Sequence, residues 1–131
     1  MHAQISKIFS MKTIAVVGMS SNPERPSHFV SKYMINNGFK IFPVNPGQKE
    51  ILGLRCYPAL KDIKYEVDIV NVFRNSDYAT PIIQEAISIK AKAIWLQDGI
   101  VSSEGKQMAE DNNIIYIEND CVLRRHRMLY E

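Results

Sequence analysis

The sequence has few cysteines and no long apolar run, and these two absences exclude several classes of protein. The two cysteines, Cys56 and Cys121, are too few for a disulfide scaffold, and their separation fits no zinc motif. No segment approaches the roughly 20 apolar residues of a membrane span, and the first ten residues lack the apolar core of a secretory signal. We therefore expect a cytoplasmic protein that does not associate with membranes.

Excess charge is also scarce. The 131 residues carry 16 Lys and Arg against 14 Asp and Glu, a formal net charge of +2, which is too small to indicate a nucleic-acid binder. Both excess charges fall in a basic tail, residues 121–131, which holds Arg124, Arg125 and Arg127 against Glu131. With 46% hydrophobic residues, the chain is expected to form one globular domain over residues 1–131, including an N-terminal extension over residues 1–11.

Short apolar runs alternate with segments of helical periodicity along the chain. We expect strands at residues 13–18, 39–44, 68–73, 93–96 and 114–117. We expect helices at residues 26–37, 75–89 and 103–112, with a last short helix after residue 120. This alternation predicts βαβ units. The fold class is therefore α/β: a Rossmann-like, doubly wound, mainly parallel sheet of five strands with helices on both faces.

Several local features refine this prediction. Pro43 cannot donate to a sheet, so its strand must end there or lie beside open space, and Pro81 fits a helix only near the first turn. Residues 45–60 are rich in turn signals and are expected to form a long connection, with at most a short helix near residue 60. Phe29 and Val30 are expected on the inward face of their helix, and Ser103 is expected to cap the helix that follows it.

In such a sheet, ligands bind over the carboxyl ends of the strands. After the first strand, Gly18 lets the backbone turn sharply, and Ser20 and Ser21 offer hydroxyl and amide groups. The helix that begins at Pro26 offers unpaired N–H groups, and Arg25 adds a forked cation suited to phosphate. The segment is neither a G-x-G-x-x-G motif nor a P-loop. A diphosphate site and a plain strand-to-helix turn therefore both remain open.

The ends of the next two strands narrow the choice of ligand. Asn45 stands where an NAD site usually has an acid, which argues against NAD but not against a ligand with a phosphorylated ribose. Phe73 and Arg74 end the third strand and could supply a stacking surface and a second phosphate partner. The alternative is that Phe73 lies in the core and Arg74 pairs with Asp77.

The sequence contains little catalytic equipment. His28 is expected to be a packed or solvated residue of a first helical turn, and no nucleophile stands near it in the sequence. Asp98 lies near a strand end, but no acid–base partner can be assigned to it. Cys121 is interpreted as a small buried hydrophobe and the basic tail as a solvated helix face. We predict no catalytic residue and no metal site.

Four strand-end segments, taken together, resemble the small stand-alone CoA-binding domain proteins and the N-terminal part of the succinyl-CoA synthetase α chain. They are residues 18–27 (GMSSNPERPS), 42–46 (FPVNP), 70–74 (VNVFR) and 95–99 (WLQDG). The resemblance runs from about Lys12 to the C-terminus. It implies a Rossmann-like domain that holds coenzyme A or an acyl-CoA across the strand ends. It does not imply ligase activity, because the synthetase uses further domains for catalysis.

The resemblance also implies which residues contact the ligand. Around the diphosphate these are Gly18, Ser20, Ser21, Arg25 and Pro26. After the second strand they are Pro43, Asn45 and Pro46. At the nucleotide they are Val72, Phe73 and Arg74, and after the fourth strand they are Gln97 and Gly99. In the tail, Cys121 and His126 fit the family pattern, but Arg125 occupies the place of an acid.

Three functions remain open. The first is a CoA or acyl-CoA binding module without catalysis, and this is the one that the strand-end segments favour. The second is a small enzyme that uses NADP or handles thioesters. The third is an interaction module that uses the domain as a scaffold and the basic tail as a contact. A protein partner or a homo-oligomer is compatible with each of them.

Overall fold

The computed structural model describes residues 2–130, and its centre is a sheet of five parallel strands. The strands are β1 (Thr13–Val17), β2 (Lys40–Val44), β5 (Ile69–Val72), β6 (Ala93–Leu96) and β7 (Ile115–Ile117). They lie in the order β2-β1-β5-β6-β7, and every neighbouring pair is parallel. The predicted α/β Rossmann-like sheet is thereby confirmed. The order reverses between β1 and β5, which is where such sheets hold their ligands.

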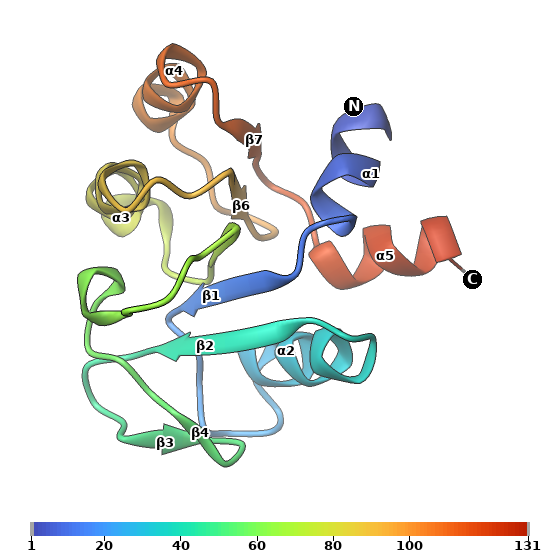
Figure 1. The fold of residues 1–131 in the computed structure, drawn as a ribbon, viewed down its shortest axis with the longest axis vertical. Coiled ribbons are helices and arrows are strands. Elements are labelled where there is room, and N and C mark those ends of the chain that lie inside the picture. Colours follow the sequence, from blue (N-terminus) through green and yellow to red (C-terminus); the bar gives the residue numbers. More distant parts are fainter. Residues whose placement is uncertain (1, 131) are drawn as a thin grey trace.

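Helices cover both faces of this sheet. They are α1 (His2–Phe9), α2 (Pro26–Asn36), α3 (Ser76–Ser88), α4 (Ser103–Asp111) and α5 (Val122–Tyr130). Helices α3 and α4 lie on one side, and α1, α2 and α5 lie on the other (Figure 1). Side chains of β1 alternate between the two cores: Ala15 and Val17 pack towards α3 and α4, and Ile14 and Val16 towards α2. Burial on both faces explains why the strands are almost continuously apolar.

No helix within residues 2–130 combines the length and the apolar character that a bilayer crossing requires.

Residues 2–9 are an integral part of the domain, although the sequence pattern marks residues 1–11 as an extension. They form α1, which buries Ile5, Ile8 and Phe9 in the core shared with α2 and α5. The ring of Phe9 stacks on Trp95 of β6 at 5.9 Å between centroids. The spacing of these apolar residues, at positions i, i+3 and i+4, is that of one helical face.

The connection after β2 contains a hairpin that the sequence pattern does not predict. Strands β3 (Glu50–Ile51) and β4 (Leu54–Arg55) pair antiparallel, and a short 3₁₀ helix, η1 (Leu60–Asp62), follows close to its predicted place. The two turn residues, Leu52 and Gly53, have φ values of 55° and 73°. A hairpin turn with two positive φ angles usually announces itself by Asn-Gly or Asp-Gly. Here the first turn residue is Leu52, so the sequence pattern does not indicate a hairpin.

Four local predictions can be compared with the structure. Pro43 lies in β2 at the edge of the sheet, which agrees with the prediction that its strand would end there or lie beside open space. Phe29 was expected to face inward but is 47% exposed. Ser102, not Ser103, caps α4, because its Oγ accepts an amide of the first turn at 2.9 Å. Pro81 lies inside α3, beyond the first turn, on an exposed position.

Candidate ligand-binding site

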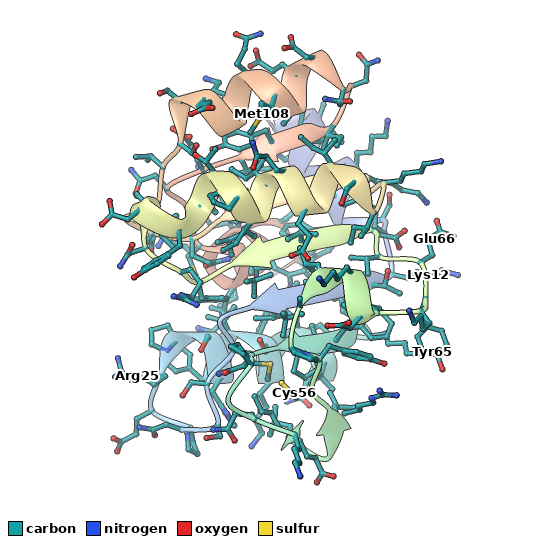
Figure 2. The ribbon with its side chains drawn as sticks, turned by 90° about the vertical axis from the view of Figure 1, so that its left-hand side faces the viewer. Lys12, Arg25, Cys56, Tyr65, Glu66 and Met108 are labelled. Atoms are coloured by element: carbon teal, nitrogen blue, oxygen red, sulfur yellow. The ribbon has the colours of Figure 1, made fainter. Side chains whose placement is uncertain are left out.

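A cavity of about 560 Å³ lies at the carboxyl ends of β1, β5 and β6. This volume falls within the usual range for small-molecule sites. The cavity is lined by Gly18, Ser20, Arg25, Pro26, Ser27, Phe29, Val30, Phe73, Gln97, Asp98, Ile100 and Cys121. Arg25, which opens onto this cavity, lies on the opposite side of the molecule from Lys12 and Glu66, which mark the amino ends of β1 and β5 (Figure 2).

The loop between β1 and α2 forms one wall and is held by its own polar groups. Gly18 turns the chain with a φ of +86°. The Ser20 N–H donates to Ser27 Oγ at 2.8 Å, and the Ser20 Oγ accepts the Asn22 N–H at 3.0 Å. The side chain of Asn22 in turn accepts the Glu24 N–H at 3.0 Å. These successive bonds fix the path of the backbone between the strand and the helix.

This wall also presents backbone N–H groups that the protein leaves unused. Arg25 precedes α2 in an extended conformation and places no side-chain cap on the helix, and Pro26 occupies its start. Within residues 2–130, the amides of Met19, Ser21 and Ser27 donate no hydrogen bond, but Met19 is fully buried, and of the three residues only Ser27 both lines the cavity and lies in the first turn of α2. Unpaired amides at a helix N-terminus, together with its positive dipole end, form a site for an anion.

The predicted residues after β2 support this loop and do not line the cavity. Asn45 donates from Nδ2 to the Met19 carbonyl at 2.9 Å and accepts the Gly47 N–H on Oδ1 at 2.8 Å. Its amide is therefore used to join the two loops. Pro43 is buried, and its carbonyl accepts the Tyr57 N–H. Pro46 is exposed outside the cavity lining.

At the end of β5, three consecutive residues have three different surroundings. Val72 is fully buried in the core beneath the strand ends, and its carbonyl accepts the Gln97 N–H, so it does not line the cavity. Phe73 is partly buried and lines the cavity. The side chain of Arg74 crosses over Gly18, and its guanidinium carbon lies 4.4 Å from the ring centroid of Tyr78. Among the described residues Arg74 forms no ion pair, so the expected alternative partner, Asp77, is not engaged.

The end of β6 supplies the opposite wall. Gln97 is 4% exposed, lines the cavity and donates from Nε2 to Asn71 Oδ1. Asp98 also lines the cavity, and the guanidinium of Arg124 in α5 donates to its two carboxylate oxygens at 3.0 and 2.9 Å. These bonds from Arg124 hold the pKa of Asp98 below its usual value. Gly99 lies outside the lining, with its N–H donated to the Asn119 side chain at 2.8 Å.

The tail contributes to the site, contrary to its interpretation as a solvated helix face. Arg124 and Arg125 both pair with Asp120, at 2.9 and 2.7 Å. Cys121 was expected to be buried, but it is half-buried and lines the cavity. His126 is buried, and its Nδ1 lies 2.8 Å from the Tyr33 hydroxyl. The excess charge that the sequence concentrates in the tail is therefore largely used to attach α5 to the domain.

Sequence reasoning found part of this cavity. The structure brings six of the predicted contact residues into its lining: Gly18, Ser20, Arg25, Pro26, Phe73 and Gln97. Ser21 is exposed on the same loop without lining the cavity. The lining residues that were not assigned to the ligand are Ser27, Phe29, Val30, Asp98, Ile100 and Cys121. A signal was available for the first three, because residues of a first helical turn face the same space as the loop before them.

The lining combines one cationic wall with residues that are mostly apolar or hydrogen-bonded within the protein. One wall carries Arg25 and the free amide of Ser27, and the other residues are mostly apolar or already paired. His28 is buried, with Nδ1 2.9 Å from the Ser20 carbonyl, so it packs in the first helical turn as expected. Within residues 2–130, no three His, Cys, Asp or Glu side chains are grouped to hold a metal ion.

The fold and the cavity define an α/β protein with a ligand-sized site at the carboxyl edge of a parallel sheet. A model of the CoA binding domain family matches residues 12–127, and the chain belongs to this family. Protein YneT of Bacillus subtilis is 40% identical over 125 residues, which cover 95% of this chain and 93% of YneT.

Two further relatives place the domain in context. ADP-forming acetate–CoA ligase II of Archaeoglobus fulgidus is 32% identical over 105 residues, which cover 79% of this chain but only 16% of the ligase. The chain therefore corresponds to a small part of that enzyme. A solved structure of a hypothetical protein from Pyrococcus horikoshii OT3 superposes with a TM-score of 0.96 at 32% identity, over 100% of this chain and 93% of the other.

Proposed function

We propose that the protein binds coenzyme A, free or acylated, in the cavity at the strand ends and carries out no catalysis of its own. The observation that carries this proposal is the wall formed by the loop after β1. The unused amide of Ser27 and the side chain of Arg25 lie there at the start of α2. Membership of the CoA binding domain family favours coenzyme A as the anion.

The charge of the site suits a small polyphosphate. Arg25 borders the cavity on one side, and Arg74 lies across Gly18 at the neighbouring strand end. A guanidinium forms paired, charge-assisted hydrogen bonds with phosphate oxygens, each stronger than a neutral hydrogen bond. Two positioned cations and a helix N-terminus are sufficient for a diphosphate, and a protein with a net charge of +2 needs no basic surface to bind it.

The rest of the cavity suits the less polar part of the ligand. Phe29, Val30, Phe73 and Ile100 supply apolar surface beside the polar wall. Phe29 is 47% exposed, although a phenylalanine gains free energy when it leaves water. A bound pantetheine or acyl chain would cover this ring. Pro43, Asn45, Pro46 and Val72 would then act by shaping the loops and the backbone around the nucleotide.

The absence of catalysis is inferred from the surroundings of the reactive groups. His28 is buried against the Ser20 carbonyl, and Asp98 is held by Arg124 in an ion pair. Neither group lies free to exchange a proton with a ligand. Within residues 2–130, the cavity lining contains no histidine that could serve Cys121 or a serine as a base.

Ligand-dependent melting tests the proposal directly. The purified protein is heated with coenzyme A, acetyl-CoA, NAD, NADP or ATP. A ligand present at 100 times its Kd should add about 2.7 kcal/mol to the free energy of unfolding. We expect coenzyme A and acetyl-CoA to raise the melting temperature. Stabilisation by NADP with no effect of coenzyme A would overturn the proposal and favour the NADP-dependent alternative.

A further inference from the structure

The two cysteines of the chain have sharply different surroundings. Cys56 is 6% exposed, its thiol donates to the Asn45 carbonyl at 3.5 Å, and burial raises the pKa of this thiol. Cys121 is half-buried and lines the cavity together with Arg25. It also stands directly before α5 and accepts the Arg125 N–H on its carbonyl. Only Cys121 is therefore open to a molecule inside the cavity.

A second observation, independent of the cysteine, is a buried hydrogen-bond acceptor in the wall of the same cavity. The Gln97 side chain is more than nine-tenths buried, and its Nε2 is committed to Asn71. Within residues 2–130, the Gln97 Oε1 atom accepts no hydrogen bond. Every fully buried side-chain oxygen or nitrogen of these residues has a partner, so the Oε1 atom is not fully buried. The Oε1 atom therefore opens into the cavity that Gln97 lines. It is a fixed acceptor for an N–H or O–H of a ligand.

The acids near Cys121 carry no unpaired negative charge that would repel a polyphosphate ligand. Asp120, the preceding residue, is paired with Arg124 and Arg125. Asp98, which lines the same cavity, is paired with Arg124. Carboxylates left unpaired at this wall would repel the phosphates of a ligand. Two arginines against two carboxylates leave this wall without net negative charge.

We propose that Cys121 captures the sulfur end of the bound ligand as a reversible mixed disulfide. This inference rests on the proposed function, because the ligand must be coenzyme A in its disulfide form. The Cys121 thiolate attacks one sulfur of the disulfide. A bond forms between Cys121 Sγ and that sulfur, the original S–S bond breaks, and one CoA thiolate leaves and takes up the proton lost by Cys121. One disulfide is consumed and one is formed, so the step needs no further oxidant.

Binding would make this exchange selective. A ligand held by the loop after β1 presents its sulfur to Cys121 at a high effective concentration, whereas a disulfide without a diphosphate meets Cys121 only by collision. The protein would then be modified according to the ratio of CoA disulfide to CoA thiol. Excess CoA thiol would reverse the reaction by attacking the mixed disulfide.

Intact-mass spectrometry under non-reducing conditions tests the proposal. The protein is incubated with CoA disulfide or, separately, with glutathione disulfide at equal concentration. We expect one CoA adduct per chain, released by dithiothreitol, in the natural protein and in Cys56→Ser, and none in Cys121→Ser. Acetyl-CoA has neither a thiol nor a disulfide and should slow the reaction by occupying the cavity. Arg25→Ala should slow the reaction with CoA disulfide about tenfold or more and leave that with glutathione disulfide unchanged.

Three results would overturn the inference. They are an adduct on Cys56, an equal rate with glutathione disulfide, and the lack of any adduct in a protein that coenzyme A stabilises against melting. The last of these results leaves the proposed function standing and removes only the capture by Cys121. A protein that neither melts later with coenzyme A nor forms the adduct would remove both.

Discussion

The side chain of Arg74 lies directly over Gly18, so close that a Cβ atom on residue 18 would lie 2.9 Å from Arg74 Cδ. The two residues follow neighbouring strands, β1 and β5, at the point where the strand order reverses. The missing side chain of Gly18 therefore creates the path along which Arg74 crosses the strand ends. At the far end of this path, the guanidinium of Arg74 meets the ring of Tyr78 at 4.4 Å.

Substitution of this glycine should impair both stability and binding. In Gly18→Ala, the new methyl group must displace Arg74, and alanine must adopt a φ of +86°. A left-handed conformation alone costs about 1–2 kcal/mol. Gly53→Ala is a matched control, because Gly53 has a φ of +73° and a Cβ atom on residue 53 would meet no other atom within 4 Å. We expect both variants to melt earlier and only Gly18→Ala to lose CoA affinity in calorimetry; equal affinities would contradict the role given to this contact.

The two arginines should contribute to affinity in a salt-dependent way. Arg25→Gln and Arg74→Gln should each weaken coenzyme A binding about tenfold or more, because a hydrogen bond to a charged group contributes about 1.5–3 kcal/mol. Arg55→Gln removes an equal charge from the hairpin, where Arg55 lies over the ring of Tyr57. Calorimetric titration at low and high salt should show a loss in the first two variants and no change in the third. A uniform small loss in all three would indicate a general charge effect instead of a site.

Acid sensitivity should centre on Asp68, at the amino end of the sheet. Burial acts to raise the pKa of Asp68, but the N–H groups of Lys12 and Thr13 and the ammonium of Lys92 outweigh burial, and its pKa lies below the usual value. A lowered pKa in the folded state means that the stabilisation is complete above the unfolded pKa of about 3.9. It is lost as the pH falls through the lower, folded value.

Asp68→Asn should therefore cost about 1.5–3 kcal/mol at neutral pH, with the gap to the natural protein closing below about pH 4. Urea unfolding across this pH range measures the gap. Glu66→Gln removes the exposed partner of the same Lys92, which lies 3.1 Å away, and should cost less than about 1 kcal/mol. A constant gap down to pH 2 would show that the charge of Asp68 does not stabilise the fold.

The attachment of α5 should depend on Asp120. This carboxylate is 9% exposed and accepts bonds from the Cys121 N–H, Arg124 and Arg125. Asp120→Asn should cost about 2 kcal/mol, because it leaves charged partners without their anion. Asp98→Asn, with a side chain 58% exposed, should cost less than about 1 kcal/mol although it also pairs with Arg124. Chemical denaturation of both variants, followed by circular dichroism, would reveal a reversed order if α5 depended instead on Asp98.

The sheet could be predicted from the sequence because its chemistry is local. Strand β6 lies between helices on both faces, so residues 93–96 are all apolar and all buried. Helix caps can also be predicted, because their side chains can accept a hydrogen bond from a backbone N–H, as Asn75 does before α3. The hairpin escaped prediction because Leu52 occupies a left-handed turn position that sequence patterns assign to Asn, Asp or Gly.

The cavity could be predicted only in part because it depends on register and on distant elements. The loop residues Gly18, Ser20 and Arg25 follow a strand and could be located from it. Cys121 reaches the same cavity only because β7 pairs with β6 in one particular register and α5 returns across the sheet. Arg124 binds Asp98 across 26 residues of chain, and no local pattern encodes this pairing.

The packing of α1 against α5 has a consequence for the order of folding during synthesis. Helices α1 and α5 lie side by side although they are far apart in the sequence (Figure 1). The centroid of the Phe9 ring lies 5.1 Å from that of His126 and 6.2 Å from that of Tyr130. During synthesis Phe9 precedes all of its ring partners, of which Phe39 and Trp95 follow first and His126 and Tyr130 follow much later. Contacts of such long sequence separation form late and slow folding. The packing around α1 is therefore completed only after α5 has been synthesised.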